Sequence, residues 1–296
     1  MLQEQQEEKW INDIRKYCQS LNISINDLYK IVTDLKVSPM IRGKAFEFST
    51  YARLKQILPG EKWMVTKPMM NAQTGTHDID IKLEHKDTRK IISIECKLAK
   101  KGDFKVLKQN KSGLGQKGDY LIPVKCMRSR TTKSNDKALA AANKFNVSLD
   151  AFITHSDQYR TSSFHVVATS IGNAFYETGE DEEANISYRF SPTQEGMEFI
   201  KKLNPPHLTE AFIQEFVYNK VYLASSFDIV VSHETGIICG RKKCLDKSNC
   251  GFIPNYPVIN FGNVQNLEST EVPYPKNKWI EIEKCEAFFE ELLLKL

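Results

Sequence analysis

Apolar residues recur at helical spacing at the start of the chain. Residues 5–21 and 24–35 each place them three or four positions apart, which predicts two amphipathic helices. Ser24, with Asp27 three positions later, resembles a capping box that begins the second helix. Pro39 restarts the chain, and a third helix is expected to end near Leu58, before a Pro-Gly pair. The pattern therefore predicts a helical region ahead of the first strands.

The pattern changes to alternation in the next part of the chain. Residues 63–70 are expected to form a strand, and residues 77–83 and 91–97 alternate apolar with polar side chains. A polar turn separates the two alternating segments, so we expect them to pair as an antiparallel hairpin. Side chains two residues apart share a face of a strand. The packed face is then expected to hold Ile79, Ile81, Ile92, Ile94 and Cys96.

Helices and strands are also expected in the rest of the chain. The expected helices cover residues 134–145, opened by Ser134, residues 191–203, capped by Ser191, residues 209–217 and a last segment ending at Leu296; the expected strands cover residues 151–154, 164–171 and 185–190 and parts of 221–233. Pro205-Pro206 is the strongest internal boundary. It divides the chain into a helical region (1–38), a core (39–204) and an extension (205–296) that either joins the core domain or stands beside it.

Composition and charge narrow the classes of protein. The 296 residues include 41 basic and 37 acidic ones, a net charge of +4, which permits a nucleic-acid binder only if the charges are segregated along the chain. No apolar run is long enough to cross a bilayer, and the polar N-terminus does not resemble a signal peptide. We therefore expect a cytoplasmic protein without a membrane partner, whose seven cysteines are reduced thiols.

Carboxylates and a lysine lie at one end of the expected hairpin. Asp78 and Asp80 share one face of their strand, and Glu95 and Lys97 share a face of the next. Hard oxygen ligands suit Mg²⁺, which can polarise a phosphate and lower the pKa of an attacking water. A neighbouring lysine can offset the developing negative charge. This combination indicates hydrolysis of phosphodiester bonds.

The same residues resemble the PD-(D/E)XK nuclease superfamily, whose signature is an acidic residue on one strand and Glu-X-Lys on the next. Glu95-Cys96-Lys97 supplies the second half, and Asp80 or Asp78 the first. The proline of the name is absent, because His77 precedes Asp78 and isoleucine precedes Asp80. Many members read acid-Ile-Asp with the second acid as the metal ligand, so we rank Asp80 above Asp78.

The resemblance covers residues 40–135 and implies an α/β fold with a PD-(D/E)XK, restriction-endonuclease-like core, a central mixed sheet flanked by helices. It also implies a glutamate on the helix before the hairpin, for which Glu47 is the candidate, as a second-metal or outer ligand; the alternative is an exposed helix carboxylate. The expected catalytic residues are Asp80, Glu95, Lys97, Asp78 and Glu47, with Mg²⁺ held by Asp80, Glu95 and Asp78.

A type II restriction endonuclease is the closest functional match that the resemblance implies. The chain has the size of a stand-alone enzyme and carries no Walker loop. Cutting both strands of double-stranded DNA with one site per chain favours a homodimer, and the extension is expected to contribute to DNA recognition or dimerisation. The alternatives are a repair or junction-resolving nuclease of the same superfamily and a catalytically silent DNA-binding module.

The basic charge is concentrated after the expected site. Residues 97–133 contain eleven basic residues against Asp103 and Asp119. Such a surface suits phosphate contacts, and an arginine can also read guanine in the major groove; a solvated face is the alternative. The candidates for DNA contact are Lys100, Lys105, Lys108, Arg128 and Arg130.

Three cysteines and a histidine lie close together in the C-terminal extension. His233, Cys239, Cys244 and Cys250 have the residue types of a structural zinc site. The segment lacks a Cys-X-X-Cys pair, so reduced thiols without zinc are the favoured interpretation. His155 and His165 lie in apolar surroundings and are expected to be core or surface residues, not metal ligands.

Overall fold

The computed structural model describes residues 2–34, 36–68, 79–128, 135–144, 147–180, 186–203, 210–268 and 271–296. These residues form two compact units. One consists of Met1–Ala45 with Thr178–Arg189, and the other of Phe46–Glu177 with Phe190–Leu296. The boundary expected at Pro205-Pro206 lies outside the described residues.

Three helices begin the chain, as the apolar spacing predicts: α1 (Leu2–Ser20), α2 (Ile25–Thr33) and α3 (Val37–Ile57). The predicted capping box is confirmed, because the Ser24 hydroxyl accepts a hydrogen bond from Asp27 N and the Asp27 carboxylate accepts one from Ser24 N, both at 3.0 Å. Helix α3 begins two residues before Pro39, since proline is tolerated in the first turn of a helix.

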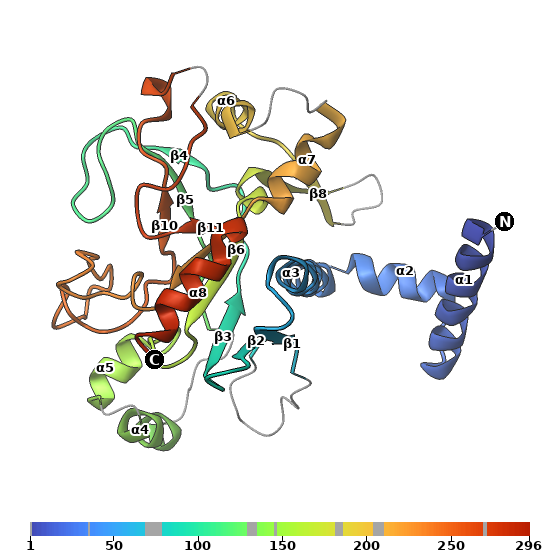
Figure 1. Ribbon diagram of the computed structural model, residues 1–296, viewed down its shortest axis with the longest axis horizontal. Coiled ribbons are helices and arrows are strands. Elements are labelled where there is room, and N and C mark those ends of the chain that lie inside the picture. Colours follow the sequence, from blue (N-terminus) through green and yellow to red (C-terminus); the bar gives the residue numbers. More distant parts are fainter. Residues whose placement is uncertain are drawn as a thin grey trace. The chain divides into compact units, whose positions relative to one another are not determined.

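A six-stranded mixed sheet lies at the centre of the second unit (Figure 1). Its strands, in spatial order, are β1 (Trp63–Thr66), β2 (Ile81–His85), β3 (Ile91–Cys96), β6 (Val166–Ser170), β9 (Val221–Ser225) and β11 (Ile280–Glu281). Strands β3 and β6 are parallel, and the other neighbouring pairs are antiparallel. Because β9 and β11 belong to this sheet, residues after 205 complete it. The expected α/β architecture with a central mixed sheet is confirmed.

The predicted hairpin is confirmed in β2 and β3, which pair with Ile81 opposite Ile94. The first strand begins at Ile81, later than expected, and runs on to His85, so the turn is shorter than expected. Four of the five residues expected on the packed face are buried in one cluster: Ile81, Ile92, Ile94 and Cys96. Ile79 is only half-buried and lies outside that cluster.

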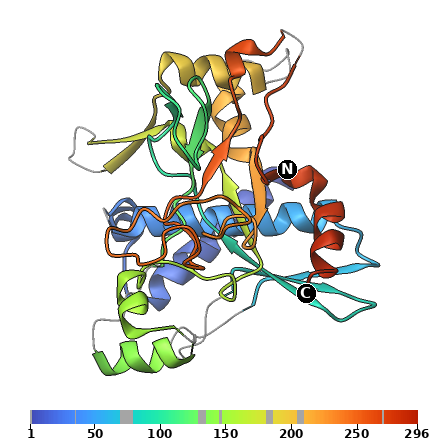
Figure 2. The ribbon, with the colours of Figure 1, turned by 90° about the vertical axis from the view of Figure 1, so that its left-hand side faces the viewer.

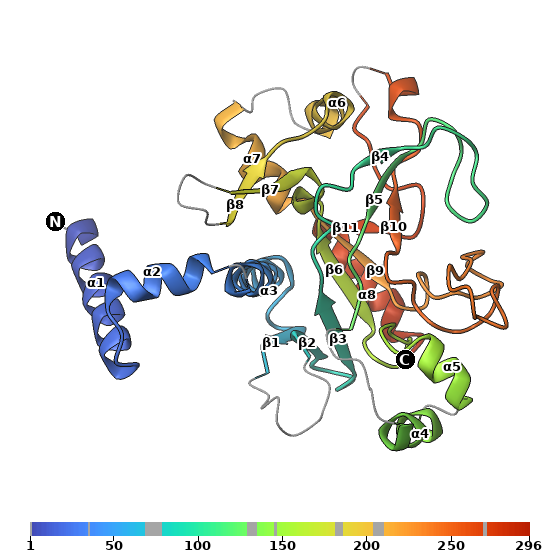
Figure 3. The ribbon, with the colours of Figure 1, turned by 180° about the vertical axis from the view of Figure 1, so that it is seen from behind.

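The two faces of the sheet pack against different layers. Val166 and Ala168 face a core built with α3 and with α8 (Cys285–Leu293), while Val167 between them faces a second core. This second core contains residues of α6 (Gln194–Leu203) and α7 (Glu210–Asn219). It also receives residues of a three-stranded sheet (Figure 3), β10 (Val258–Asn260), β5 (Tyr120–Pro123) and β4 (Lys105–Val106). The alternation along each strand thus fills both faces.

The remaining elements include one that differs in type from the prediction. Residues 151–154, expected as a strand, belong to helix α5 (Leu149–Thr154), because the Ser148 hydroxyl caps it by accepting a hydrogen bond from Ala151 N at 3.2 Å. Helix α6 begins after Thr193 instead of Ser191, and Thr193 Oγ1 accepts a hydrogen bond from Gly196 N. The other elements within the described residues are α4 (Asn135–Lys144), β7 (Tyr176–Glu180), β8 (Ile186–Phe190) and the 3-10 turns Gly172–Phe175, Val264–Asn266 and Ile282–Lys284.

Along the part of the chain that the structure describes, no helix combines the length and the apolar character that crossing a membrane requires.

The unequal burial of two isoleucines on β3 predicts a large difference in how much each one stabilises the fold. Ile94 is fully buried and Ile91, on the same strand, is 42% exposed. Ile94→Ala should lower the free energy of unfolding by about 2–5 kcal/mol, because it leaves a cavity in the core. Ile91→Ala should change it by less than about 1 kcal/mol. Urea titration measures both, and equal losses would contradict the packing described for this strand.

Candidate functional site

Asp80 lies at the end of the hairpin, directly before β2. Continuing the register of Ile81 opposite Ile94 by one pair brings Asp80 opposite Glu95. The Asp80 side chain is buried, and its Oδ2 accepts a hydrogen bond of 2.8 Å from the backbone N–H of Cys96. The backbone of β3 therefore fixes this carboxylate beside the Glu-X-Lys segment.

Glu95 lies at the end of β3, and Lys97 directly follows this strand, two positions later and on the same face. Lys97 Nζ is 2.6 Å from Glu95 Oε1, and the hydroxyl of Tyr159 donates to the same oxygen at 2.9 Å. The ammonium of Lys97 also lies over the Tyr159 ring, 5.6 Å from its centre. The Glu95 side chain is 12% exposed and that of Lys97 is 23% exposed. The structure thus brings Asp80, Glu95 and Lys97 together.

Glu47 joins this group from α3. Its side chain is only 10% exposed and forms a 2.6 Å ion pair with Lys67, so the alternative of an exposed helix carboxylate is wrong. Lys67 Nζ also donates to the backbone carbonyl of Asp80 at 3.4 Å. A lysine that follows β1 therefore connects the helix carboxylate to the start of β2. Asp78 lies outside the described residues.

The acidic side chains repel one another in a buried setting. Burial, and then the nearby Glu95 carboxylate, raise the pKa of Asp80 to about 7; Glu47 acts in the same direction, while the Cys96 N–H opposes the shift. Burial acts to lower the pKa of Lys97, but Glu95 and Tyr159 outweigh it, so its pKa lies above its ordinary value. Lys97 is therefore charged, and Asp80 holds a proton for part of the time at neutral pH.

This donor set fits Mg²⁺. The ion binds through one or two carboxylates and keeps water molecules and phosphate oxygens in its remaining positions. Asp80 and Glu95 supply two carboxylates on adjacent strands. A divalent cation would also favour the charged form of Asp80, which burial and its neighbours now disfavour.

The basic residues after the site differ in their surroundings. Lys100 and Lys105 both form ion pairs with the buried carboxylate of Asp103, at 2.6 and 2.7 Å. Lys108 is exposed, and Arg128 is half-buried with its backbone N–H donating to Asp157 O. Arg130 lies outside the described residues. Much of the positive charge of Lys100 and Lys105 is therefore balanced within the chain.

Two residues of the site were not found from the sequence. Lys67 directly follows β1 and pairs with Glu47. A lysine this close in the sequence to the expected acidic strand could have been recognised as a partner for a carboxylate. Tyr159 lies 64 residues from Glu95 in an irregular segment, where no periodicity points to it. Only a long-range contact places Tyr159 at the site.

The cysteines of the C-terminal extension form a second group, with a different histidine from the expected one. His155, Cys239, Cys244 and Cys250 place their ligand atoms within 4.8 Å of one another. His233 is exposed and is not part of this group, so the candidate ligand set from the sequence is wrong at that position. His155, expected to be only a core or surface residue, is buried at the end of α5 and takes its place.

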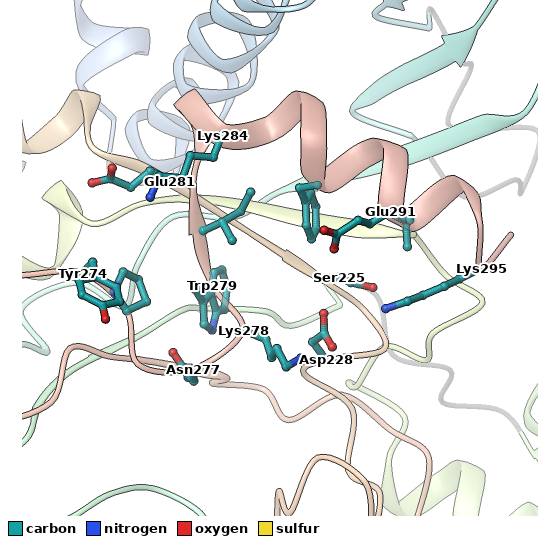
Figure 4. Close-up of a pocket in the computed structure, with 14 residues that line it drawn as sticks. Ser225, Asp228, Tyr274, Asn277, Lys278, Trp279, Glu281, Lys284, Glu291 and Lys295 are labelled. Atoms are coloured by element: carbon teal, nitrogen blue, oxygen red, sulfur yellow. The ribbon is translucent and has the colours of Figure 1, made fainter. Parts of the chain in front are cut away.

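A pocket beside α8 is separate from the acidic site. It is lined by residues that include Trp279, and the side chains of Lys278 and Lys295 point toward the carboxylate of Asp228 (Figure 4). Burial raises the pKa of Asp228 although both lysines oppose the shift. Neither Asp80 nor Glu95 lines this pocket.

Comparison of the chain with protein-family models, with curated proteins and with solved structures gave no match. The interpretation of the site therefore depends on the placement of Asp80, Glu95 and Lys97 and on their electrostatic environment.

Proposed function

We propose that this protein is a metal-dependent nuclease of the PD-(D/E)XK type that hydrolyses phosphodiester bonds of double-stranded DNA. One observation carries the proposal: the buried Asp80 is bonded to the backbone of Cys96, opposite a Glu95 that is paired with Lys97. Carboxylates on two adjacent strands with a lysine beside them have the composition needed for phosphoryl chemistry. A type II restriction endonuclease is the form of this activity that we favour.

Each residue has a distinct part in this proposal. Asp80 and Glu95 would hold Mg²⁺, which would polarise the phosphate and make water a better nucleophile. Lys97, charged and 2.6 Å from Glu95, offsets the negative charge that develops on the phosphate. Tyr159 fixes the orientation of the Glu95 carboxylate through its hydroxyl, and Lys67 holds Glu47 in the same way. Tyr159 and Lys67 are positioning residues.

A catalytic role explains the burial of Asp80 better than DNA binding alone. Burying a carboxylic acid beside two other carboxylates is unfavourable and raises its pKa. Groups whose pKa values are strongly shifted are concentrated at active sites. A catalytically silent DNA-binding module has no need of this arrangement. A repair or junction-resolving nuclease would use the same residues, so only the cleavage pattern separates it from a restriction endonuclease.

The first prediction concerns cleavage. Asp80→Ala, Glu95→Ala and Lys97→Ala should each lower the rate of DNA cleavage in Mg²⁺ by at least about 100-fold, because each removes a charge at the reacting phosphate. Tyr159→Phe should lower it only about 10-fold, since it removes one hydrogen bond to a charged group. Phage DNA, digested with and without Mg²⁺, is the substrate. Ca²⁺ should support binding without efficient cleavage.

Lys82→Ala is the matched control for Lys97→Ala. Lys82 lies on the neighbouring strand and pairs with Glu84, so its loss should leave the rate unchanged. Discrete fragments would identify a restriction endonuclease, and a smear would identify a non-specific nuclease. No cleavage by the wild type, or wild-type rates in any of the three alanine variants, would contradict the proposal.

The second prediction uses the raised pKa of Asp80. In the metal-free folded protein Asp80 keeps its proton up to about pH 7, whereas the unfolded chain releases it near 3.8. Because the folded state binds more protons in this window, stability falls as the pH rises through it. Asp80→Asn removes this fall, so the variant should gain stability over the wild type between pH 4 and pH 8, by at most about 4 kcal/mol. Mg²⁺ should then stabilise the wild type more than the variant.

Asp103→Asn is a control for which we expect the opposite change in stability, because the pKa of Asp103 is lowered and that of Asp80 is raised. Hydrogen bonds from Lys100 and Lys105 outweigh the effect of burial and keep the pKa of Asp103 below its ordinary value. Its stabilising contribution is therefore present above that ordinary value and is lost as the pH falls. Asp103→Asn should be less stable than the wild type at neutral pH. Urea titration over this pH range measures both variants, and parallel pH profiles for Asp80→Asn and the wild type would refute the role assigned to Asp80.

The third prediction concerns the basic surface. Lys108, Lys111 and Lys117 are exposed, whereas Lys100 and Lys105 share Asp103 as an ion-pair partner. Log affinity for B-DNA should fall with log salt, with a slope of about −0.9 for each phosphate contact. Replacing two of the exposed lysines, Lys108 and Lys111, with alanine should flatten this slope more than replacing Lys100 and Lys105. Binding is measured in Ca²⁺, and an unchanged slope in both variants would place these lysines away from DNA.

A further inference from the structure

We propose that His155, Cys239, Cys244 and Cys250 bind one zinc ion as a structural site. The four ligand atoms lie within 4.8 Å of one another, and all four side chains are at least half-buried. In a tetrahedral zinc site with Zn–S bonds of about 2.3 Å, neighbouring sulfurs are about 3.8 Å apart. The group is therefore close to the size that zinc requires. This inference does not depend on the nuclease proposal.

The state of the thiols supports a metal site. All three cysteines are free, although their sulfur atoms face one another at the centre of the loop. Cys244 Sγ lies 3.3 Å from the carbonyl of Asp246, and Cys239 N donates to Lys247 O. The backbone therefore folds around the sulfurs and holds them in place.

His155 is oriented as a ligand by its neighbours. Its Nδ1 lies 2.6 Å from Gln158 Oε1, and the amide nitrogen of Gln158 donates to the carbonyl of Ile253 at 2.9 Å. This second bond places the oxygen of Gln158 toward the ring, so Nδ1 carries the proton and Nε2 keeps its lone pair for a metal. The ring also stacks on Phe252, with 4.3 Å between the centres. Metal-binding histidines usually have such an outer partner.

As the structure describes it, the middle of the loop that holds the cysteines has no regular secondary structure to hold it in place. Between the end of β9 at Ser225 and the start of β10 at Val258 the described chain contains no named helix or strand. Its own small core consists of Val231, Cys239 and Cys244, with Ile237 and Cys250 at the margin. Three of these five residues are the proposed ligands, so this small core has few other members; Ile229, Val230 and Ile253, nearer the two ends of the loop, belong to the main core. Long loops without secondary structure are uncommon in compact domains unless something holds them in place.

Zinc is the metal that this ligand set favours. Thiolates are soft ligands and select zinc over Mg²⁺, which prefers oxygen. Four protein ligands leave no open position for water, which is typical of a structural site and not of a catalytic one. The loop lies beside α5 in all three views (Figures 1, 2 and 3), so the ion would join the loop to the segment that follows this helix.

The test is metal analysis of the full chain, purified under reducing conditions and loaded with zinc. We expect about one zinc ion per chain. Cys250→Ser, Cys244→Ser and His155→Ala should each lose this zinc, while His233→Ala, which changes an exposed histidine outside the group, should keep it. Mass spectrometry of the metal content gives the stoichiometry. Chelation should also lower the midpoint of thermal unfolding of the wild type and of His233→Ala.

Cobalt substitution keeps the test valid if a variant fails to fold. Co²⁺ added to the metal-free wild type should give the visible bands of a tetrahedral site and a thiolate-to-metal band in the near ultraviolet. The site would be refuted by a zinc-loaded wild type with well under one equivalent, by octahedral cobalt spectra without thiolate bands, or by full zinc retention in both cysteine variants. Loss of zinc in His233→Ala but not in His155→Ala would restore the histidine that the sequence indicates.

Discussion

The pairing of β2 with β3 is the contact on which the candidate site depends. Ile81 and Ile94 are fully buried opposite each other, and this apolar pair sets the register. A slip of one residue would turn the side chains of the slipped strand, including its isoleucine, to the other face of the sheet. The same register brings Asp80 opposite Glu95 and allows the Cys96 N–H to bond to the Asp80 carboxylate. The packing of the core therefore brings the side chains of the candidate site together.

The β2–β3 hairpin could be predicted from the sequence because the pattern that defines it extends over only a few neighbouring residues. Alternation over a few residues predicts both the strands and the face that each side chain occupies. Ile81, Ile92 and Ile94 lie in the expected core, and Asp80 and Glu95 lie together at the hairpin's end. The capping box of α2 was predictable for the same reason, since its partners are three residues apart.

The predictions from the sequence that were wrong or incomplete concern short apolar runs and contacts between residues far apart in the chain. Residues 151–154 are too few for periodicity to separate a strand from a helix, and the N-cap at Ser148 decides the outcome. His155 and Tyr159 reach their partners across 84 and 64 residues of chain, counted to Cys239 and Glu95. No local pattern encodes such contacts. The pairing of Lys100 and Lys105 with Asp103 likewise changes a basic stretch into a partly neutralised one.

The short segment after α5 connects the cysteine group with the acidic site at Glu95. His155 lies in the cysteine group, and Tyr159, four residues later, bonds to Glu95. Four residues span at most about 14 Å, so the segment has little slack. The Tyr159 carbonyl also accepts a hydrogen bond from Ile253 N at 2.8 Å, which connects this segment to the cysteine loop. Hydrogen bonds tolerate displacements of only a few tenths of an ångström before they weaken. A displacement of the cysteine loop at Ile253 would therefore reach the hydroxyl that, together with Lys97, holds the Glu95 carboxylate.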